Sequence, residues 1–174
     1  SLLQQKAAAA CLRKGGVTPR QLTLAFAGDL QAQCTASNYT MRALDVPYAG
    51  VYGACSTMAE TLALAAAFAA SGYSERTLAL SSSHFCAAER QFRTPLDYGG
   101  KRTPTAQWTA TAAGACLVRP AGTAGVRILS ATFGRVRDYA VRDINNMGAA
   151  MMPAAASTLL ACFAALGTAP QNYD

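Results

Sequence analysis

Cys55 lies in the segment 53–56, where an apolar run of the sequence gives way to a helical pattern. A thiol at the start of a helix faces backbone N–H groups and the positive end of the helix dipole, which stabilises its thiolate. Such a cysteine can act as a nucleophile. The alternative is that a small residue stands there because a strand and a helix pack closely. The spacing alone leaves both interpretations open.

His84, the single histidine of the chain, follows a predicted strand over 76–82. Open parallel sheets bind ligands at the carboxyl edge of their strands, and imidazole changes its charge near neutral pH. A Cys55–His84 pair within hydrogen-bond reach would activate the sulfur. The other interpretation is a partly buried histidine that holds the following loop.

The segment 83–104 is the most densely polar part of the sequence, and we predict a long ordered loop there because its aromatic residues argue against disorder. Its cations are Arg90, Arg93, Lys101 and Arg102. A guanidinium pairs with a carboxylate through two parallel hydrogen bonds, and the same geometry suits phosphate. Alternatively, the segment is a solvated basic loop with Glu89 and Asp97 as surface partners.

The elements that would position these side chains alternate between strand and helix. Apolar runs at 22–27, 48–52 and 76–82 predict buried strands, and the segment 57–71 predicts a helix buried on all sides. This order requires parallel pairing with right-handed crossovers. The fold class is therefore α/β.

The remaining segments predict further elements at both ends of the sheet. A helix over 2–14 ends at two glycines, and Ser37 caps a short helix through Leu44. Thr57 and Glu60 fit a capping box. Two β-rich runs, 107–118 and 126–136, predict an antiparallel pair of strands. An apolar helix follows from Pro153 to Gly167. That helix is roughly 21 Å long, too short to cross a membrane, so we expect it to be buried.

Composition excludes several classes of protein. The 174 residues are 52% hydrophobic and 14% charged, which excludes disorder and predicts that a partner chain or further sequence covers much of the surface. The net charge of +6 is spread over single arginines, so a nucleic-acid surface is not expected. The six cysteines form no Cys-x-x-Cys pair, which favours free thiols over a zinc site, and no export signal opens the sequence. We expect an intracellular protein.

Several blocks of the sequence resemble the stage V sporulation protein AD family. They are Gly53-Ala54-Cys55-Ser56-Thr57-Met58-Ala59-Glu60, Ser82-Ser83-His84, Ala88-Glu89-Arg90-Gln91-Phe92-Arg93 and Asn146-Met147-Gly148-Ala149-Ala150-Met151. The resemblance implies a thiolase-like fold, which has two similar α/β halves, each built around a five-stranded mixed sheet with helices on both faces. Residues 1–174 would be a single, partial N-terminal half-domain that lacks the first strand region.

The resemblance also implies a function. Members bind dipicolinic acid, free or as its calcium chelate, and support its uptake into the developing spore without catalysis. The implied ligand site consists of Cys55, Ser56, His84, Glu89, Arg90 and Arg93. In that site Cys55 takes the place of the thiolase nucleophile, and Arg90 pairs with a carboxylate. No cofactor and no metal beyond the ligand's calcium are expected.

The resemblance further implies partners and a location. We expect a homodimer that acts with other membrane proteins of the stage V sporulation A operon, peripheral to the inner membrane of the spore and without a transmembrane helix in this chain. Two alternatives remain. One is a thiolase-type acyltransferase that is acylated on Cys55, and the other is a structural half-domain that only binds partner proteins.

Overall fold

The computed structural model describes residues 1–92, 108–122, 125–143 and 146–173, and the side chains of residues 89–92 lie outside this description. The chain forms two compact units, Ser1–Arg127 and Ile128–Asp174. The first unit contains a sheet with helices, and the second contains one long helix.

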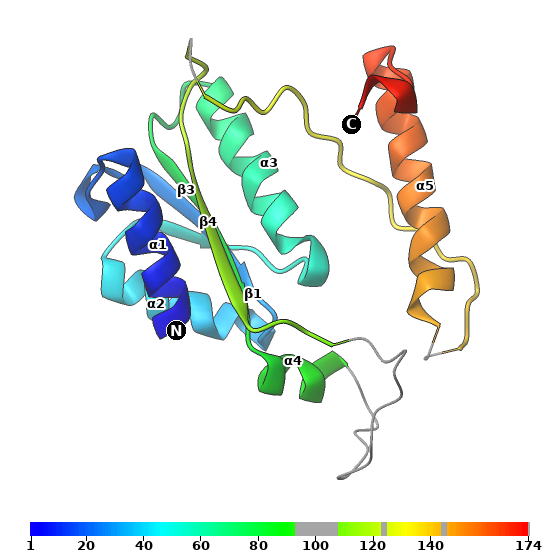
Figure 1. Ribbon diagram of the computed structural model, residues 1–174, viewed down its shortest axis with the longest axis horizontal. Coiled ribbons are helices and arrows are strands. Elements are labelled where there is room, and N and C mark those ends of the chain that lie inside the picture. Colours follow the sequence, from blue (N-terminus) through cyan, green and yellow to red (C-terminus); the bar gives the residue numbers. More distant parts are fainter. Residues whose placement is uncertain (93–107, 123–124, 144–145, 174) are drawn as a thin grey trace. The chain divides into compact units, whose positions relative to one another are not determined.

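The first unit is built on a four-stranded sheet in the order β2-β1-β3-β4 (Figure 1). The strands are β1 (Leu24–Asp29), β2 (Tyr48–Gly50), β3 (Thr77–Ser83) and β4 (Ala112–Val118). β1 pairs in parallel with β2 and β3, and β4 pairs antiparallel with β3. The α/β class and the parallel core of the sheet are thus confirmed.

The predicted antiparallel pair of 107–118 with 126–136 is wrong, because the described residues 125–143 contain no strand. β4 pairs with β3 instead. The segment 128–136 belongs to the second unit, so it has no neighbouring strand edge within its own unit. A β-rich run without a partner gains no ladder hydrogen bonds, which is why composition alone misplaced it. Four strands therefore stand, among the described residues, where the resemblance implied five.

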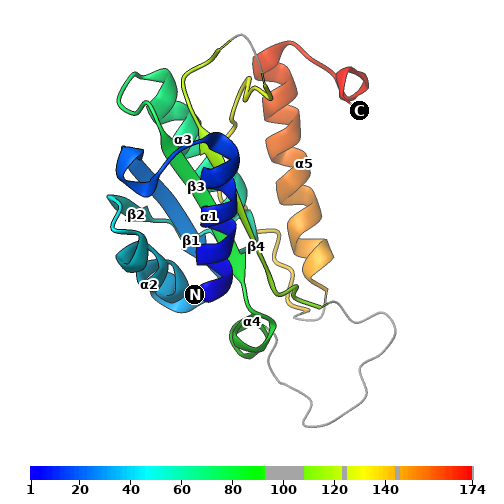
Figure 2. The same ribbon diagram turned by 60° about the vertical axis from the view of Figure 1, so that its left-hand side comes forward.

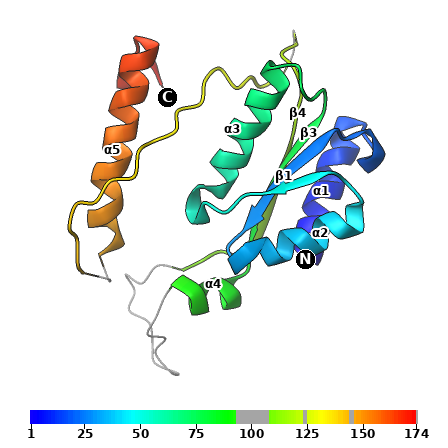
Figure 3. The same cartoon turned by 180° about the vertical axis from the view of Figure 1, so that it is seen from behind.

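Helices cover both faces of the sheet, as predicted. Figures 1 and 3 show α1 (Leu2–Gly15) and α2 (Thr35–Leu44) on one face and α3 (Thr57–Ala70) on the other. The alternation of side chains along β3 explains this arrangement, because Leu78 and Leu80 pack into the core under α1 while Ala79 packs into the core under α3. The end of α1 at Gly15 is confirmed, and Gly16 follows with a positive φ of 62°.

Two details of the predicted helices are wrong. α3 buries a single stripe of small residues, Thr57, Thr61, Ala65 and Ala69, instead of all its sides, because it packs on the sheet through one face only. The capping box also fails, since Thr57 is already the first helical residue and its hydroxyl accepts a hydrogen bond from the Gly53 N–H at 3.2 Å. Similarly, α2 starts at Thr35, before the predicted cap Ser37.

The predicted loop over 83–104 begins with a helix, α4 (Phe85–Phe92), and its residues 93–104 lie outside the described residues. α4 starts just beyond the carboxyl end of β3 (Figure 2). Its first turn is closed by the Ala88 N–H, which donates to the His84 carbonyl at 3.0 Å. The polar residues that follow β3 are thus partly helical.

The second unit contains α5 (Met147–Leu166), and the prediction of a short helix starting at Pro153 is wrong. The Asn146 side chain caps the helix by accepting from the Ala149 N–H at 3.1 Å, so Pro153 lies inside the second turn. Twenty residues span about 30 Å, so α5 is long and apolar enough to cross a membrane by length and composition. A core helix of a soluble protein passes the same test. None of its residues is buried, contrary to the predicted buried helix.

Candidate functional site

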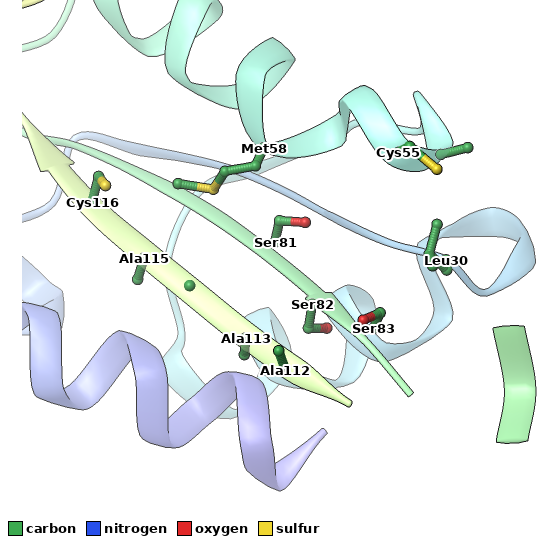
Figure 4. A pocket seen from close by; sticks show the side chains of 12 residues that line it. Leu30, Cys55, Met58, Ser81, Ser82, Ser83, Ala112, Ala113, Ala115 and Cys116 are labelled. Carbon is green, nitrogen blue, oxygen red and sulfur yellow. The ribbon is translucent and has the colours of Figure 1, made fainter. Parts of the chain in front are cut away.

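A cavity of about 390 Å³ lies on the α3 side of the sheet, at the carboxyl end of β3 (Figure 4). Its lining comes from the loop after β1, the turn before α3, the first turn of α3, the end of β3 and most of β4. Its lining residues are Leu30, Ala54, Cys55, Met58, Ser81, Ser82, Ser83, Ala112, Ala113, Gly114, Ala115 and Cys116. Every one of these described lining residues is uncharged.

Small side chains on two paired strands create the space. In the register of β3 and β4, Ser81 pairs with Gly114 and Ser83 pairs with Ala112. A Cβ atom placed on Gly114 would have no other atom within 4 Å, so this position opens directly into empty space. The floor of the cavity is therefore apolar backbone and methyl groups, with serine hydroxyls along one side.

The turn that carries Cys55 is strained and firmly held. Ala54 adopts a positive φ of 49°, which is unfavourable for a residue with a Cβ atom. Two hydrogen bonds hold the turn: the Ser56 hydroxyl donates to the Gly53 carbonyl at 2.7 Å, and the Gly53 N–H donates to the Thr57 hydroxyl. Cys55 itself is exposed, with its thiol at the cavity. The arrangement presents a sulfur to any bound molecule.

β1 makes a close backbone contact near this turn, at Gly28. A Cβ atom on Gly28 would lie 2.0 Å from the Val51 carbonyl oxygen and 2.4 Å from the Thr57 Cγ2. Only glycine permits this approach of the backbones. The contact at Gly28 therefore sets the distance between the sheet and the start of α3, and with it the position of the Cys55 turn.

A buried carboxylate holds the loop that follows β1. Asp29 is 1% exposed; its Oδ1 accepts from the Gln31 N–H at 2.9 Å, and its Oδ2 accepts from the Ser37 N–H at 2.8 Å and from the Ser37 hydroxyl at 2.7 Å. Gln4 completes the network by donating to the Ser37 hydroxyl at 2.9 Å. Leu30, which lines the cavity, lies between Asp29 and Gln31 and is held by these bonds.

Cys34, just before α2, and Tyr48, the first residue of β2, are two further ionisable groups near the loop that follows β1. The Cys34 thiol is buried and donates to the Val51 carbonyl at 3.2 Å, and burial raises its pKa. Burial also raises the pKa of the Tyr48 phenol to about 12, with further contributions from Cys34 and Asp29. Both groups therefore stay protonated at neutral pH and serve the packing of the loop rather than chemistry.

Comparison with known proteins decides the family. The sequence model described as Stage V sporulation protein AD matches residues 1–174. The chain belongs to the stage V sporulation protein AD family. It is 42% identical over 173 residues to Stage V sporulation protein AD of Bacillus subtilis (strain 168), which covers 99% of this chain and 51% of that protein. The chain thus spans about half the length of this curated relative.

Solved structures confirm the thiolase-like fold of this family member. AbyA1, a tetronic acid condensing enzyme, is 19% identical with a TM-score of 0.65 over 95% of this chain and 58% of its own. The 3-oxoacyl-[acyl-carrier-protein] synthase III from Aquifex aeolicus VF5 is 22% identical with a TM-score of 0.53 over 68% of this chain and 37% of its own. At such identities the likeness shows the fold alone.

Among the side chains that it describes, the structure places one residue of the predicted ligand site of this family member, Cys55, at the cavity. Cys55 lines the cavity, whereas Ser56 and His84 stand next to lining residues in the chain without lining it themselves. The Ser56 hydroxyl is directed to the Gly53 carbonyl, and the half-buried His84 precedes α4. Glu89 and Arg90 lie in α4 with side chains outside the described residues, and Arg93 lies outside them altogether. The roles of these charged residues stay predictions.

Sequence reasoning missed most of the lining. Met58 and Leu30 were not singled out, because one reads as helix core and the other as a loop residue. The alternation of Ala112, Gly114 and Cys116 on β4 was a usable signal, since a strand with small residues at every second position leaves room on that face.

Proposed function

We propose that this chain is the ligand-binding part of a non-catalytic sporulation protein, which binds dipicolinic acid, or its calcium chelate, at the cavity beside Cys55 and supports its uptake into the developing spore. The observation that supports the proposal is an uncharged cavity that starts at the carboxyl end of β3 and runs along its antiparallel neighbour β4, beside the start of α3, in a member of a sporulation family. The carboxyl ends of parallel strands, such as β1 and β3, are where open α/β sheets bind small molecules.

Size and polarity suit a small flat diacid. A volume of about 390 Å³ falls at the lower end of the range for small-molecule sites. The floor of Ala112 and Gly114 would accept a ring face, and the Ser81 hydroxyl would donate to a carboxylate oxygen. A bound dianion also needs cations, and the proposal assigns this role to Arg90 and Arg93.

In this proposal the chain works as part of a larger assembly. A second copy of the chain and the membrane proteins of the same operon are the proposed partners, at the inner membrane of the spore. The low charge content of 14% supports such coverage, because an isolated soluble domain carries roughly 25% charged residues.

A second function follows from the exposure of Cys55 at the cavity. The thiol would attack a thioester and hold the acyl group, with the free thiol of the carrier as the leaving group. Mass spectrometry after incubation with acetyl-coenzyme A distinguishes the two functions. A stable acetyl adduct on Cys55, absent from a Cys55→Ala variant, would favour the acyltransferase over the binding protein.

The proposal is tested by filling the cavity from its floor. Gly114→Leu places a side chain in a direction where nothing lies within 4 Å, so the fold should tolerate it while the ligand loses its space. We expect calorimetry to show dipicolinate binding to the wild-type chain and at least about tenfold weaker binding to Gly114→Leu, which corresponds to about 1.4 kcal/mol. Titrations with and without calcium identify the form that binds.

Gly122→Leu is the matched control, because Gly122 also has open space around its Cβ direction and does not line the cavity. It should bind as the wild type does. Circular dichroism and melting curves establish that both variants fold. Absence of binding to the wild-type chain, or equal binding by both variants, would contradict the proposed site.

A further inference from the structure

The second unit, Ile128–Asp174, carries many apolar side chains at its surface. Among its described residues, 128–143 and 146–173, none is buried, whereas both clusters of buried apolar residues belong to the first unit. Thirteen large apolar side chains are exposed on the described part of the second unit, against six on that of the first. Soluble proteins rarely expose extensive apolar surface unless another molecule binds there. The second unit is therefore a candidate interface.

Part of this surface is a segment with the composition of a strand, 128–136. It follows α5 within the unit (Figure 3), so closely that a Cβ atom added to Gly134 would collide with the Thr158 side chain. Leu129 and Phe133, on the same segment, are exposed. The segment forms no strand pair with any described residue. A strand-like run that packs on a helix but has no neighbouring strand is a β–α unit that lacks its sheet.

The chemistry of this surface favours a protein sheet over a lipid bilayer. α5 is long and apolar enough to enter a bilayer, but the segment 128–136 that packs on it has backbone N–H and C=O groups outside any helix or strand, which hydrocarbon cannot satisfy. Arg135 and Arg137 also place charges beside the helix in sequence and unit. A sheet edge meets both needs, because it supplies hydrogen bonds to the segment and an apolar face to α5.

A second copy of the same segment is a poorer partner than a larger sheet. Two copies of 128–136 would form a two-stranded ladder, and such pairs are only marginally stable without further strands. Longer relatives contain more polypeptide of the same fold. The chain covers 51% of Stage V sporulation protein AD of Bacillus subtilis (strain 168), and it covers 58% of AbyA1 in a match over 95% of its own length. The polypeptide that fits this surface best is the part of such a relative that this chain does not match.

We propose that the second unit is a docking surface for that unmatched polypeptide. The segment 128–136 adds to the edge of a sheet in the partner as a further strand, and the exposed side of α5 packs on the same partner. The interaction goes beyond the proposed function, because every described residue that lines the cavity belongs to the first unit. Binding of the partner and binding of dipicolinate can therefore be tested separately.

The test co-expresses the 174-residue chain with the unmatched part of the Bacillus subtilis protein, each as a separate chain with its own affinity tag. We expect the two chains to copurify in equal amounts, as native mass spectrometry measures. Hydrogen–deuterium exchange then compares the 174-residue chain alone with the complex. The amides of 128–136 should exchange at least about tenfold more slowly in the complex, because strand pairing protects them from water.

Two variants test the two parts of the surface. Val136→Pro removes a backbone donor from the segment, and Leu160→Glu places a charge on the exposed side of α5. In competition with the wild-type chain for the partner, each should bind at least about tenfold more weakly. Leu2→Glu is the matched control and should bind as the wild type does, because Leu2 in α1 is 66% exposed and Leu160 is 67% exposed. Circular dichroism establishes that the variants fold.

Several results would overturn the inference. One is the absence of a complex, and another is equal binding by the wild type, Val136→Pro and Leu160→Glu. Protection of 128–136 in the 174-residue chain alone, as a monomer or a dimer, would show that the chain covers this surface itself. Binding to phosphatidylglycerol vesicles that Leu160→Glu abolishes, without copurification, would assign the surface to a membrane. Should Leu160→Glu fail to fold, Val136→Pro and the exchange rates of the wild type still decide.

Discussion

Removal of the Asp29 carboxylate is expected to destabilise the fold and to weaken the cavity together. Asp29 is buried at the end of β1 and accepts three hydrogen bonds, two from backbone N–H groups and one from the Ser37 hydroxyl. Asp29→Ala would leave the Ser37 N–H buried without this acceptor. Leu30 would then lose the bonds that hold its loop at the cavity.

The size of the effect follows from these three bonds. Hydrogen bonds to a charged group contribute about 1.5–3 kcal/mol each, but bonds that share one carboxylate do not add fully. We therefore expect Asp29→Ala to lower the free energy of unfolding by about 3–5 kcal/mol. Asp29→Asn keeps one acceptor oxygen and should cost about 2 kcal/mol. Ser37→Ala removes the bond of the hydroxyl to Asp29 and its bond from Gln4, whose amide still donates to the Gly28 carbonyl at 3.2 Å, and it should cost about 1.5 kcal/mol.

Urea unfolding followed by far-ultraviolet circular dichroism measures these differences, and calorimetry measures dipicolinate binding by the folded variants. The expected order of stability is wild type, Ser37→Ala, Asp29→Asn, Asp29→Ala. A free energy of unfolding for Asp29→Ala within about 1 kcal/mol of the wild-type value would refute the reasoning, because the loss of three hydrogen bonds to a buried carboxylate should lower stability by more than that. Unchanged ligand affinity in Asp29→Asn would refute the link to Leu30.

Two further predictions concern charge. Arg90→Ala should weaken dipicolinate binding roughly tenfold or more, because one guanidinium–carboxylate contact contributes about 1.5–3 kcal/mol. The control is Arg20→Ala, at an exposed position in the short helix Pro19–Gln21, which should bind as the wild type does. An unchanged Kd for Arg90→Ala would remove Arg90 from the site. Burial raises the pKa of Tyr48 from 10.0 to about 12, so its contribution to stability is complete below pH 10 and is lost as the pH rises to about 12, since the unfolded chain releases the proton first. Urea unfolding over this pH range should show a smaller fall for Tyr48→Phe than for the wild type; an equal fall would assign the effect to other groups.

The sequence predicted the core of the fold because its signals were local. The apolar runs ending in Gly28-Asp29 and Ser81-Ser82 marked the parallel strands, and the intervening helical segments required crossovers. The Cys55 turn was located for the same reason, since a strand-to-helix junction is visible in a short window. The cavity was not predicted, because it depends on which residue of β4 stands opposite which residue of β3. The pairing of Ser81 with Gly114 joins residues that are far apart in the sequence, so local sequence patterns do not predict it.

The errors at the other end of the chain have a related cause. Proline favours the first turn of a helix, so its position predicts a start at Pro153; the helix instead begins six residues earlier at Met147, capped by Asn146, and the proline is accommodated within it. The β-propensity of the run 126–136 predicts a strand, although its residues 128–136 have no described strand edge within their own unit. In both cases a weak local preference yielded to the surrounding structure. The same principle favours testing the site by Gly114→Leu, whose effect depends on tertiary position, rather than by changes at residues that only their sequence pattern singles out.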